Sequence, residues 1–344
     1  MLIYDYDNKK TYKVILVKEK SVLLFIKIIF PFEIVLFSLL IPVVIKILST
    51  DMGTLRLMLA VDSNPLLNGL PGYTNLLILL YAGLENVITI VAFYAYVFVK
   101  QSRMLIKYFF ISAVIFPIVF SLVAVMRSYM MFHILQLIFL LIIFKSYIPK
   151  VILRKIVLIG ASVLSIIVIL MTIISFSRFS DDTSFQTYRY AGEMFLNFSG
   201  ALWPDLRGTT GGTAYFQVFN RLLGGEGATY TTLADKWNYI DGITKIDSHI
   251  FYGYIGGLII EFGFVFAFII YSVLSLILSC PFIKHKRPVF SLPNLLILGA
   301  LAHLLISGAY MFVYQGPWGN REIIFFVLVY IYFKCNNEKT SKIQ

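Results

Sequence analysis

Long apolar runs alternate with short polar stretches along most of this 344-residue chain. A helix needs about 20 apolar residues to cross the ~30 Å hydrocarbon core of a bilayer, and several runs reach that length. We therefore expect an all-α polytopic membrane protein. Eight transmembrane helices are predicted, at residues 24–48, 73–99, 105–126, 129–148, 156–176, 258–279, 291–310 and 316–333.

One long polar interval, residues 177–249, interrupts this pattern between the fifth and sixth predicted spans. It mixes arginines, acids, aromatic residues and glycines. A loop of this length in a compact protein carries a site more often than it serves as a linker. The predicted organisation is an N-terminal segment at 1–23, five helices within 24–176, the loop at 177–249, three helices within 250–333 and a tail at 334–344.

Composition agrees with the apolar pattern: 59% of the residues are hydrophobic and 14% are charged. An ordinary soluble domain has a charged fraction of roughly 25%, so that class is excluded. The net charge of +11 would suggest nucleic acid as the partner of a soluble protein. Here, 18 lysines and arginines fall in the segments of one predicted side and nine on the other. By the positive-inside rule both termini are cytoplasmic, the 177–249 loop is outside, and no nucleic-acid partner is expected.

The first apolar run follows some twenty polar and charged residues, so we expect an uncleaved anchor rather than a signal peptide. Cys280 and Cys335 fall at predicted cytoplasmic ends and imply no disulfide framework.

Three titratable residues lie inside predicted spans. An unpaired charge such as Glu85 near a span centre costs at least ~2.5–3.5 kcal/mol. Glu85 is therefore protonated, paired, or facing water, as a structural pair or as a cavity-lining functional residue. His133 and His303 are either hydrogen-bonded packing residues or proton carriers.

Two arginines occupy span boundaries. Arg127 opens an apolar run at a predicted outer turn, where its guanidinium either extends to the surface or binds phosphate with its planar fork of donors. Near the last span, Gly316-Pro317 predicts a helix break at membrane depth, which has to line a protein-enclosed cavity. Arg321 is then a site candidate, and a local Arg321–Glu322 pair is the alternative.

Within the loop, FQTYRYAGEMFLNFSGALW at 185–203 has aromatic residues at helical spacing. It predicts an amphipathic helix on the outer interface, with Arg189 and Glu193 paired four residues apart. The glycine-rich GTTGGTA after Arg207 lacks the lysine and spacing of a phosphate loop, so we interpret it as a flexible hinge. At the end of the loop, Asp247 and His249 are expected outside and Glu261 at the interface, beside glycines that permit close helix packing.

Together these features resemble the Wzy-type oligosaccharide repeat-unit polymerases of O-antigen and capsular polysaccharide. The matching features are Arg127 at the start of an apolar helix, the large loop with YRYAGEMFLNF, and His249 followed by Glu261-Phe262-Gly263. The last feature is also similar to the related O-antigen ligases. The resemblance covers roughly residues 50–333.

The resemblance implies a GT-C-like glycosyltransferase of the bacterial inner membrane that joins repeat units carried on undecaprenyl diphosphate, on the periplasmic side. No cofactor or metal is expected. The donor already carries its diphosphate leaving group, so no nucleotide binding or energy input is needed outside the cytoplasm. The implied partners are undecaprenyl-diphosphate-linked oligosaccharides, membrane lipid and a polysaccharide chain-length regulator.

Each site residue has an expected role in this chemistry. Arginines stabilise the departing diphosphate, and a carboxylate or histidine takes the proton of the acceptor hydroxyl. The candidate proton acceptors are Asp247, His249 and Glu261. The candidate residues that bind diphosphate or glycan are Arg127, Arg178, Tyr188, Arg189, Arg207, Arg221 and Arg321.

Other functions stay open. A lipid-linked glycan flippase or other transporter would show repeated halves and paired broken helices, and the chain has one predicted break and no visible repeat. Another multispan glycosyltransferase, an O-antigen ligase or a membrane acyltransferase are further alternatives. An enzyme that uses polyprenyl monophosphate sugars would rely on an acid in the first outer loop, and Asp51 and Asp62 keep that option open.

Overall fold

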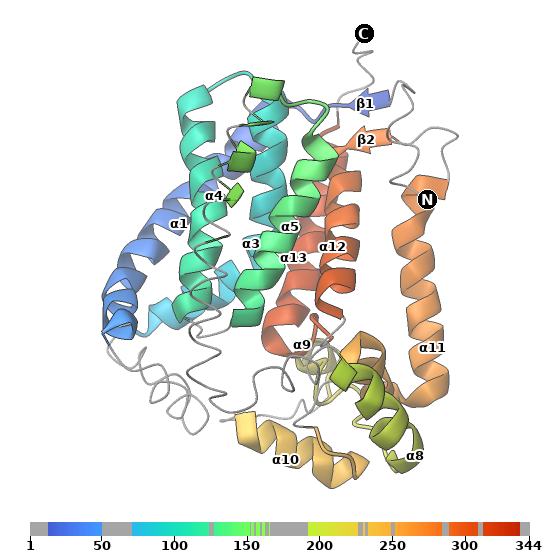
Figure 1. Ribbon diagram of the computed structural model, residues 1–344. Helices are drawn as coiled ribbons and strands as arrows, with labels where there is room; N and C mark the ends of the chain where they lie inside the picture. Colours follow the sequence, from blue (N-terminus) through green and yellow to red (C-terminus); the bar gives the residue numbers. More distant parts are fainter. Residues whose placement is uncertain are drawn as a thin grey trace.

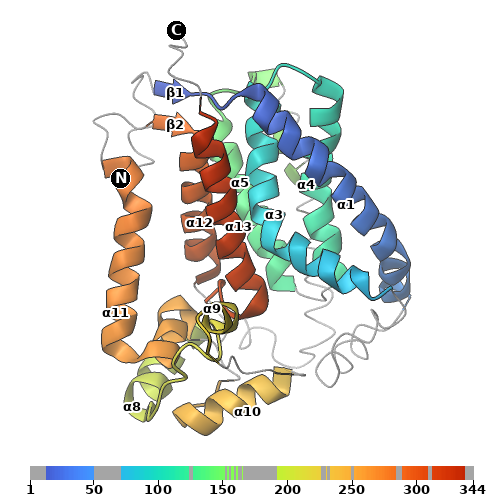
Figure 2. The same cartoon turned by 180° about the vertical axis from the view of Figure 1, so that it is seen from behind.

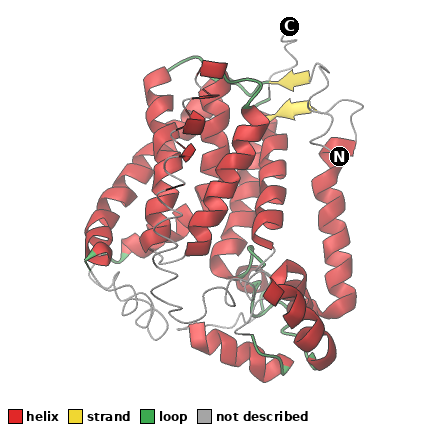
Figure 3. Cartoon of the chain, viewed as in Figure 1, coloured by secondary structure: helices red, strands yellow, loops and turns green. Residues whose placement is uncertain are grey.

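The computed structural model in Figure 1 describes residues 13–49, 71–123, 127–151, 192–225, 230, 233–248, 252–283, 289–308 and 312–337, with isolated positions between 153 and 165. These residues are largely helical, with two short strands (Figure 3). Four helices are long and apolar enough to cross a membrane, namely those at Glu19–Ile47, Tyr73–Phe98, Arg103–Val123 and Gly253–Ile277. The prediction of a helical membrane protein is confirmed at this level.

The helices follow the apolar runs of the sequence. Their bounds are α1 Glu19–Leu48, α3 Tyr73–Phe98, α4 Arg103–Val123, α5 Arg127–Phe144, α11 Gly253–Ile283, α12 Leu292–Gly308 and α13 Gly316–Cys335. Each coincides with one predicted span. The remaining prediction, a span at 156–176, lies mostly outside the described residues, so the number of eight spans stays a prediction.

Helix α3 is the centre of the bundle. It packs against α1, α4, α5, α12 and α13, and every residue from Tyr81 to Ala95 is buried. Close approach of α13 requires a glycine on α3, because a Cβ at Gly83 would lie 2.6 Å from the Phe325 ring. The peripheral helices instead expose large apolar side chains, such as Ile28 on α1 and Phe268 on α11. Apolar outer faces around a packed interior are what a bilayer-facing bundle needs.

One end of the bundle gathers three segments that are far apart in the sequence. Strand β1 (Lys13–Ile15) pairs in parallel with β2 (Val289–Ser291), which lies between α11 and α12. Next to it, the Lys18 N–H donates to the carbonyl of Asn336 after α13. Helices α8, α9 and α10, which come from the long loop, lie at the opposite end (Figures 1 and 2). The predicted topology requires this arrangement, and the membrane side that each end faces stays a prediction.

Helix α11 is bent at Gly263, which has φ +75° and ψ 172°. The segment before Gly263 packs against the loop helices, and the long segment after it stands at the edge of the bundle (Figure 1). The glycines that predicted close packing therefore divide into two kinds. Gly257 does pack closely, since a Cβ there would lie 2.8 Å from Cβ of Phe312, whereas Gly263 supplies a backbone conformation that other residues rarely adopt.

Candidate functional site

The described part of the long loop folds into a cap on the end of α11 and α13. We call residues 192–248 the loop cap. It has its own hydrophobic cluster, which includes Leu202, Tyr215 and Ile240 and continues into α11 through Leu258. Its helices are 192–197, η3 Phe198–Leu202, α8 Trp203–Asp205, α9 Gln217–Leu222 and α10 Leu233–Thr244.

The first helical stretch of the loop cap confirms part of the predicted amphipathic helix. Residues 192–205 are helical, with a π-helical turn at Phe198–Leu202. Phe195 and Trp203 are more than 60% exposed, while Glu193 and Leu202 are buried. An exposed aromatic row at the end of a membrane bundle is typical of contact with the bilayer interface. The start of the predicted helix, with Arg189, lies outside the described residues.

Glu261 of α11 anchors the glycine-rich segment of the loop cap. Its side chain is fully buried. The Gly212 N–H donates to Oε2 at 2.6 Å, and the Tyr215 N–H donates to Oε1. The Gly211 N–H donates to the backbone carbonyl of the same glutamate at 2.8 Å. Gly211 and Gly212 have φ of +62° and +87°, and the turn that they form directs the N–H groups of Gly212 and Tyr215 toward the carboxyl group.

The interpretation of GTTGGTA as a flexible hinge was therefore wrong. The two left-handed glycines do confer conformational freedom on the unfolded chain, but in the fold they close a carboxylate-binding turn. An ionised carboxylate is an acceptor only, and two backbone donors satisfy it well in a buried position.

The same segment is tied to the start of α13. The carbonyl of Tyr215 accepts hydrogen bonds from the Gly316 N–H at 2.6 Å and from Asn320 Nδ2 at 2.9 Å. Asn320 is fully buried, and its Oδ1 accepts from the Val218 N–H at 3.1 Å. The loop cap therefore bridges α11 and α13 through backbone groups of one short turn.

Gly316 and Pro317 begin a helix rather than break one. Gly316 has φ +70°, and Pro317 stands in the first turn of α13, where its missing N–H costs nothing. The break that the sequence predicted within one span is thus the connection between α12 and α13.

Lys236 of α10 contacts the place where the loop cap meets the start of α13, which we call the junction. Its Nζ is 4.6 Å from the centre of the Tyr215 ring and 3.2 Å from Gln315 Oε1. Burial lowers the pKa of Lys236 from 10.5 to about 8, and the nearby Glu261 carboxylate opposes that shift. The junction thus joins one buried carboxylate, one half-buried ammonium and the turn between them.

The described candidates for diphosphate binding are Arg207, Arg221 and Arg321. Arg207 and Arg221 are exposed on the loop cap, and Arg321 is partly exposed on α13. Arg321 donates to the carbonyl of Pro317 at 3.2 Å. Within the ranges given above, no ion pair occupies any of the three guanidinium groups. The alternative Arg321–Glu322 pair is not formed, because Glu322 bonds instead to Asn86 and His303 inside the bundle.

The remaining residues that the sequence predicted for the site are described to different extents by the structure. Asp247 is exposed at the end of α10, and its carbonyl accepts a hydrogen bond from the Tyr252 hydroxyl. Arg127 is the first residue of α5, and its side chain is not among those described. Four predicted site residues lie outside the described residues: Arg178, Tyr188, Arg189 and His249.

Sequence reasoning missed Lys236 and Asn320. Both act through partners that are distant in the chain, 79 residues for Lys236 and Gln315 and 105 for Asn320 and Tyr215. Neither belongs to a motif. The one signal was the position of Asn320 just after Gly316-Pro317, which marks a helix start.

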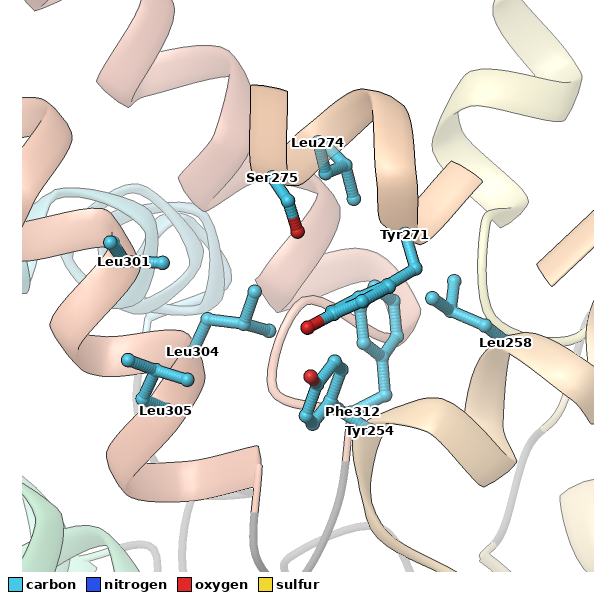
Figure 4. Close-up of a pocket in the computed structure, with 9 residues that line it drawn as sticks. All are labelled: Tyr254, Leu258, Tyr271, Leu274, Ser275, Leu301, Leu304, Leu305 and Phe312. Atoms are coloured by element: carbon cyan, nitrogen blue, oxygen red, sulfur yellow. The ribbon is translucent and has the colours of Figure 1, made fainter. Parts of the chain in front are cut away.

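A small cavity separates the two segments of α11 from α12 (Figure 4). Its volume of about 50 Å³ has room for a water molecule or two and not for a sugar ring. Leucines and Phe312 line most of it, and the hydroxyls of Tyr271 and Ser275 face its interior. The tyrosine rings of Tyr254 and Tyr271 lie 5.9 Å apart at its edge.

Among the described residues, no group of three or more histidines, cysteines and acids is arranged to hold a metal ion. No protein-family model, no curated protein sequence and no solved structure matches the chain.

Proposed function

We propose that this protein is a glycosyltransferase that polymerises undecaprenyl-diphosphate-linked oligosaccharide repeat units at the periplasmic face of a bacterial inner membrane. The observation that carries the proposal is the loop cap, an ordered polar structure fastened to membrane helices and bearing exposed arginines. An enzyme with a lipid-linked substrate needs such a site at the membrane surface, because the lipid stays in the bilayer while the glycan is in water.

The reaction has three parts. The acceptor hydroxyl attacks the anomeric carbon of the donor, the bond from that carbon to the diphosphate breaks, and the hydroxyl proton leaves to a base. Negative charge grows on the departing diphosphate, which is what Arg207, Arg221 and Arg321 are suited to stabilise. No described carboxylate forms an ion pair with any of these guanidinium groups, so none of those carboxylates competes with the diphosphate, which supports this assignment.

The three candidate bases differ in access. Glu261 is fully buried and accepts hydrogen bonds from two backbone N–H groups. We therefore assign it the role of holding the loop cap in place, and not the role of the base. Asp247 is exposed at the end of α10, and His249 follows it closely in the sequence. A base has to reach the acceptor hydroxyl within hydrogen-bond distance, which favours the exposed Asp247 over Glu261, and His249 stays a candidate from the sequence.

Profiling lipid-linked glycans in a strain that lacks the gene tests this proposal. Loss of a polymerase leaves single repeat units on undecaprenyl diphosphate, accessible from the periplasmic side. Restoration by the unaltered gene, but not by a combined Arg207→Ala, Arg221→Ala and Arg321→Ala variant, is expected at equal protein levels. Unchanged polymer length in the deletion strain would reject the proposal.

A proton-linked transporter of lipid-linked glycans is the second candidate. The observation in its favour is a pair of acid–imidazole contacts buried inside the helix bundle, His133 with Glu85 and His303 with Glu322. Ionisable residues inside membrane helices commonly mark proton pathways. The same profile separates the two functions, because loss of a flippase leaves the single repeat units on the cytoplasmic side.

A further inference from the structure

Neutral groups hold the ammonium of Lys236 at the junction. Its Nζ donates to Gln315 Oε1 at 3.2 Å and lies 4.6 Å from the centre of the Tyr215 ring. A lysine ammonium has three N–H donors. One is bonded to Gln315, and a second can point at the face of the tyrosine ring. Within the described part of the chain, no acceptor takes the third donor and no carboxylate forms an ion pair with Lys236.

Glu261 of α11 is the acid whose charge acts on Lys236. Its two carboxyl oxygens accept the backbone N–H groups of Gly212 and Tyr215, and its side chain is fully buried. The carboxylate therefore attracts the ammonium toward the junction without forming a direct ion pair among the described residues. The remaining N–H donor of Lys236 stays open to an anion that arrives from the water.

The charge of Lys236 is kept at a cost to the fold. Burial lowers the pKa of Lys236 from 10.5 to about 8, so the ammonium is less favourable here than in water. The protonated form still predominates at neutral pH, because the pKa lies above 7. An apolar side chain of similar length would avoid this cost. Charges that a fold retains against its own stability concentrate at functional sites.

Lys236 lies at the same end of α13 as Arg321. Gln315, the partner of Lys236, directly precedes α13 and makes no side-chain hydrogen bond to it. Arg321 donates to the carbonyl of Pro317 in the first turn at 3.2 Å, so the two cations contact residues two positions apart. Lys236, Gln315 and Arg321 are all partly exposed, which leaves this end of the helix accessible to an anion.

We propose that Lys236 binds a phosphoryl oxygen of the lipid-linked diphosphate at the junction, as a further cation beside Arg321. The identity of the substrate rests on the proposed function, and the inference adds a binding residue from α10 to that site. Lys236 acts as a point donor of charge, whereas Arg321 offers a planar fork. Lys236 binds and positions the diphosphate, and no bond forms or breaks on it.

Binding of labelled inorganic pyrophosphate, measured without turnover, tests the proposal. The full-length protein is placed in nanodiscs of phosphatidylcholine at neutral pH. Lys236→Met is expected to weaken pyrophosphate binding about tenfold, because it removes one charge-assisted hydrogen bond. Lys236→Arg should restore most of the affinity, and Lys245→Met, an exposed lysine of the loop cap, should leave it unchanged.

A second arm identifies the source of the anion. Undecaprenyl diphosphate in the same nanodiscs is expected to displace the labelled pyrophosphate from the unaltered protein, and about tenfold less effectively from Lys236→Met. Pyrophosphate binding that depends on Lys236 but is not displaced by the lipid would overturn the assignment to a lipid-linked diphosphate.

Gln315→Glu separates anion binding from a structural role. Its carboxylate would lie where Oε1 now accepts from Nζ at 3.2 Å, so it would hold Lys236 in place and neutralise its charge. We expect pyrophosphate binding to fall about tenfold, as in Lys236→Met, with the protease resistance of the loop cap unchanged. Asn238→Asp adds the same charge at an exposed position of α10 and should change the affinity less than twofold.

Full pyrophosphate affinity in Gln315→Glu would overturn the proposal, because Lys236 would then serve only to hold the fold. If Lys236→Met does not fold, Gln315→Glu decides the question alone. Failure here is distinct from failure of the proposed polymerase, since the profile of lipid-linked glycans tests polymerisation without reference to Lys236.

Discussion

Two buried glutamates in this protein solve the same physical problem in different ways. Glu261 meets two backbone N–H groups of a glycine turn, one on each of its carboxyl oxygens. Glu322 instead meets two side chains on one oxygen atom, the amide of Asn86 at 2.6 Å and an imidazole nitrogen of His303 at 2.8 Å. Backbone donors thus make Glu261 an anchor for the loop cap, whereas side-chain partners make Glu322 a link from α13 to α3 and α12.

The largest expected effect comes from removing the anchor. Glu261→Ala leaves two buried N–H donors without an acceptor, at about 1–3 kcal/mol each. We expect the loop cap to detach, with rapid proteolysis between residues 206 and 225 and loss of activity. Glu261→Gln keeps one acceptor oxygen and should lose roughly half as much stability. Limited proteolysis in nanodiscs measures this, with Asp205→Asn on the exposed α8 as the control. Equal protease resistance of Glu261→Ala and the parent would show that the turn does not depend on Glu261.

The next effect tests the glycine turn itself. Gly212→Ala places a side chain at φ +87°, which costs about 1–2 kcal/mol of left-handed strain. Gly224, with φ +83° and no atom within 4 Å of an added Cβ, is a matched control for that strain. Only Gly212→Ala is expected to expose the 206–225 segment, because Gly212, unlike Gly224, belongs to the turn that donates to Glu261. Identical protease patterns for both variants would assign the effect to strain alone.

A third, smaller effect concerns the arginines. Arg321→Lys keeps the charge and loses the bidentate fork, so we expect about a tenfold fall in polymerisation rate, equivalent to ~1.4 kcal/mol. The readout is dimerisation of a synthetic lipid-linked repeat unit by purified protein. Arg103→Lys, at the other end of the bundle, should keep the parent rate. A rate within twofold of the parent for Arg321→Lys would remove Arg321 from the diphosphate site.

The smallest effect is the pH dependence from Lys236. Its pKa is lowered to about 8 in the fold from 10.5, so the unfolded chain binds the proton more tightly between these values. Stability from this group is therefore lowest below pH 8 and rises as the pH increases from 8 toward 10.5. Thermal unfolding of Lys236→Met should lack that rise, while Lys245→Met, which changes an exposed lysine, should keep it. The same pH profile in all three proteins would contradict the burial of Lys236.

Much of the fold could be predicted from the sequence, and little of the site. Apolar runs identified α1, α3, α4, α5 and α11 to α13. A membrane helix makes all its backbone hydrogen bonds within one segment, so the composition of that segment alone predicts it. The Glu261 anchor joins positions 46 and 49 residues apart, and no local pattern encodes such a pairing. The glycines of GTTGGTA correctly predicted unusual backbone conformations. Whether such a segment is a hinge or a closed turn depends on its contact with Glu261, which is distant in the sequence.

The titratable residues teach the same lesson. Glu85 was expected to be protonated, paired or facing water, because an isolated charge at that depth is costly, and His303 was expected to be a hydrogen-bonded packing residue or a proton carrier. Which partners they have depends on the rotation of four helices, and that depends on side-chain packing such as the contact of Gly83 with Phe325. The local Arg321–Glu322 pair failed for this reason, since adjacent residues on a helix point to different faces.

Proteoliposomes that contain the purified protein and a synthetic undecaprenyl-diphosphate-linked repeat unit give the most direct test of the proposed function. The account predicts a ladder of products that grow by whole repeat units, with undecaprenyl diphosphate released for each unit added. It also predicts that Glu261→Ala abolishes the ladder while Asp205→Asn leaves it unchanged. Single repeat units that persist unjoined in a protein shown to be folded, whether or not they cross the bilayer, would contradict it.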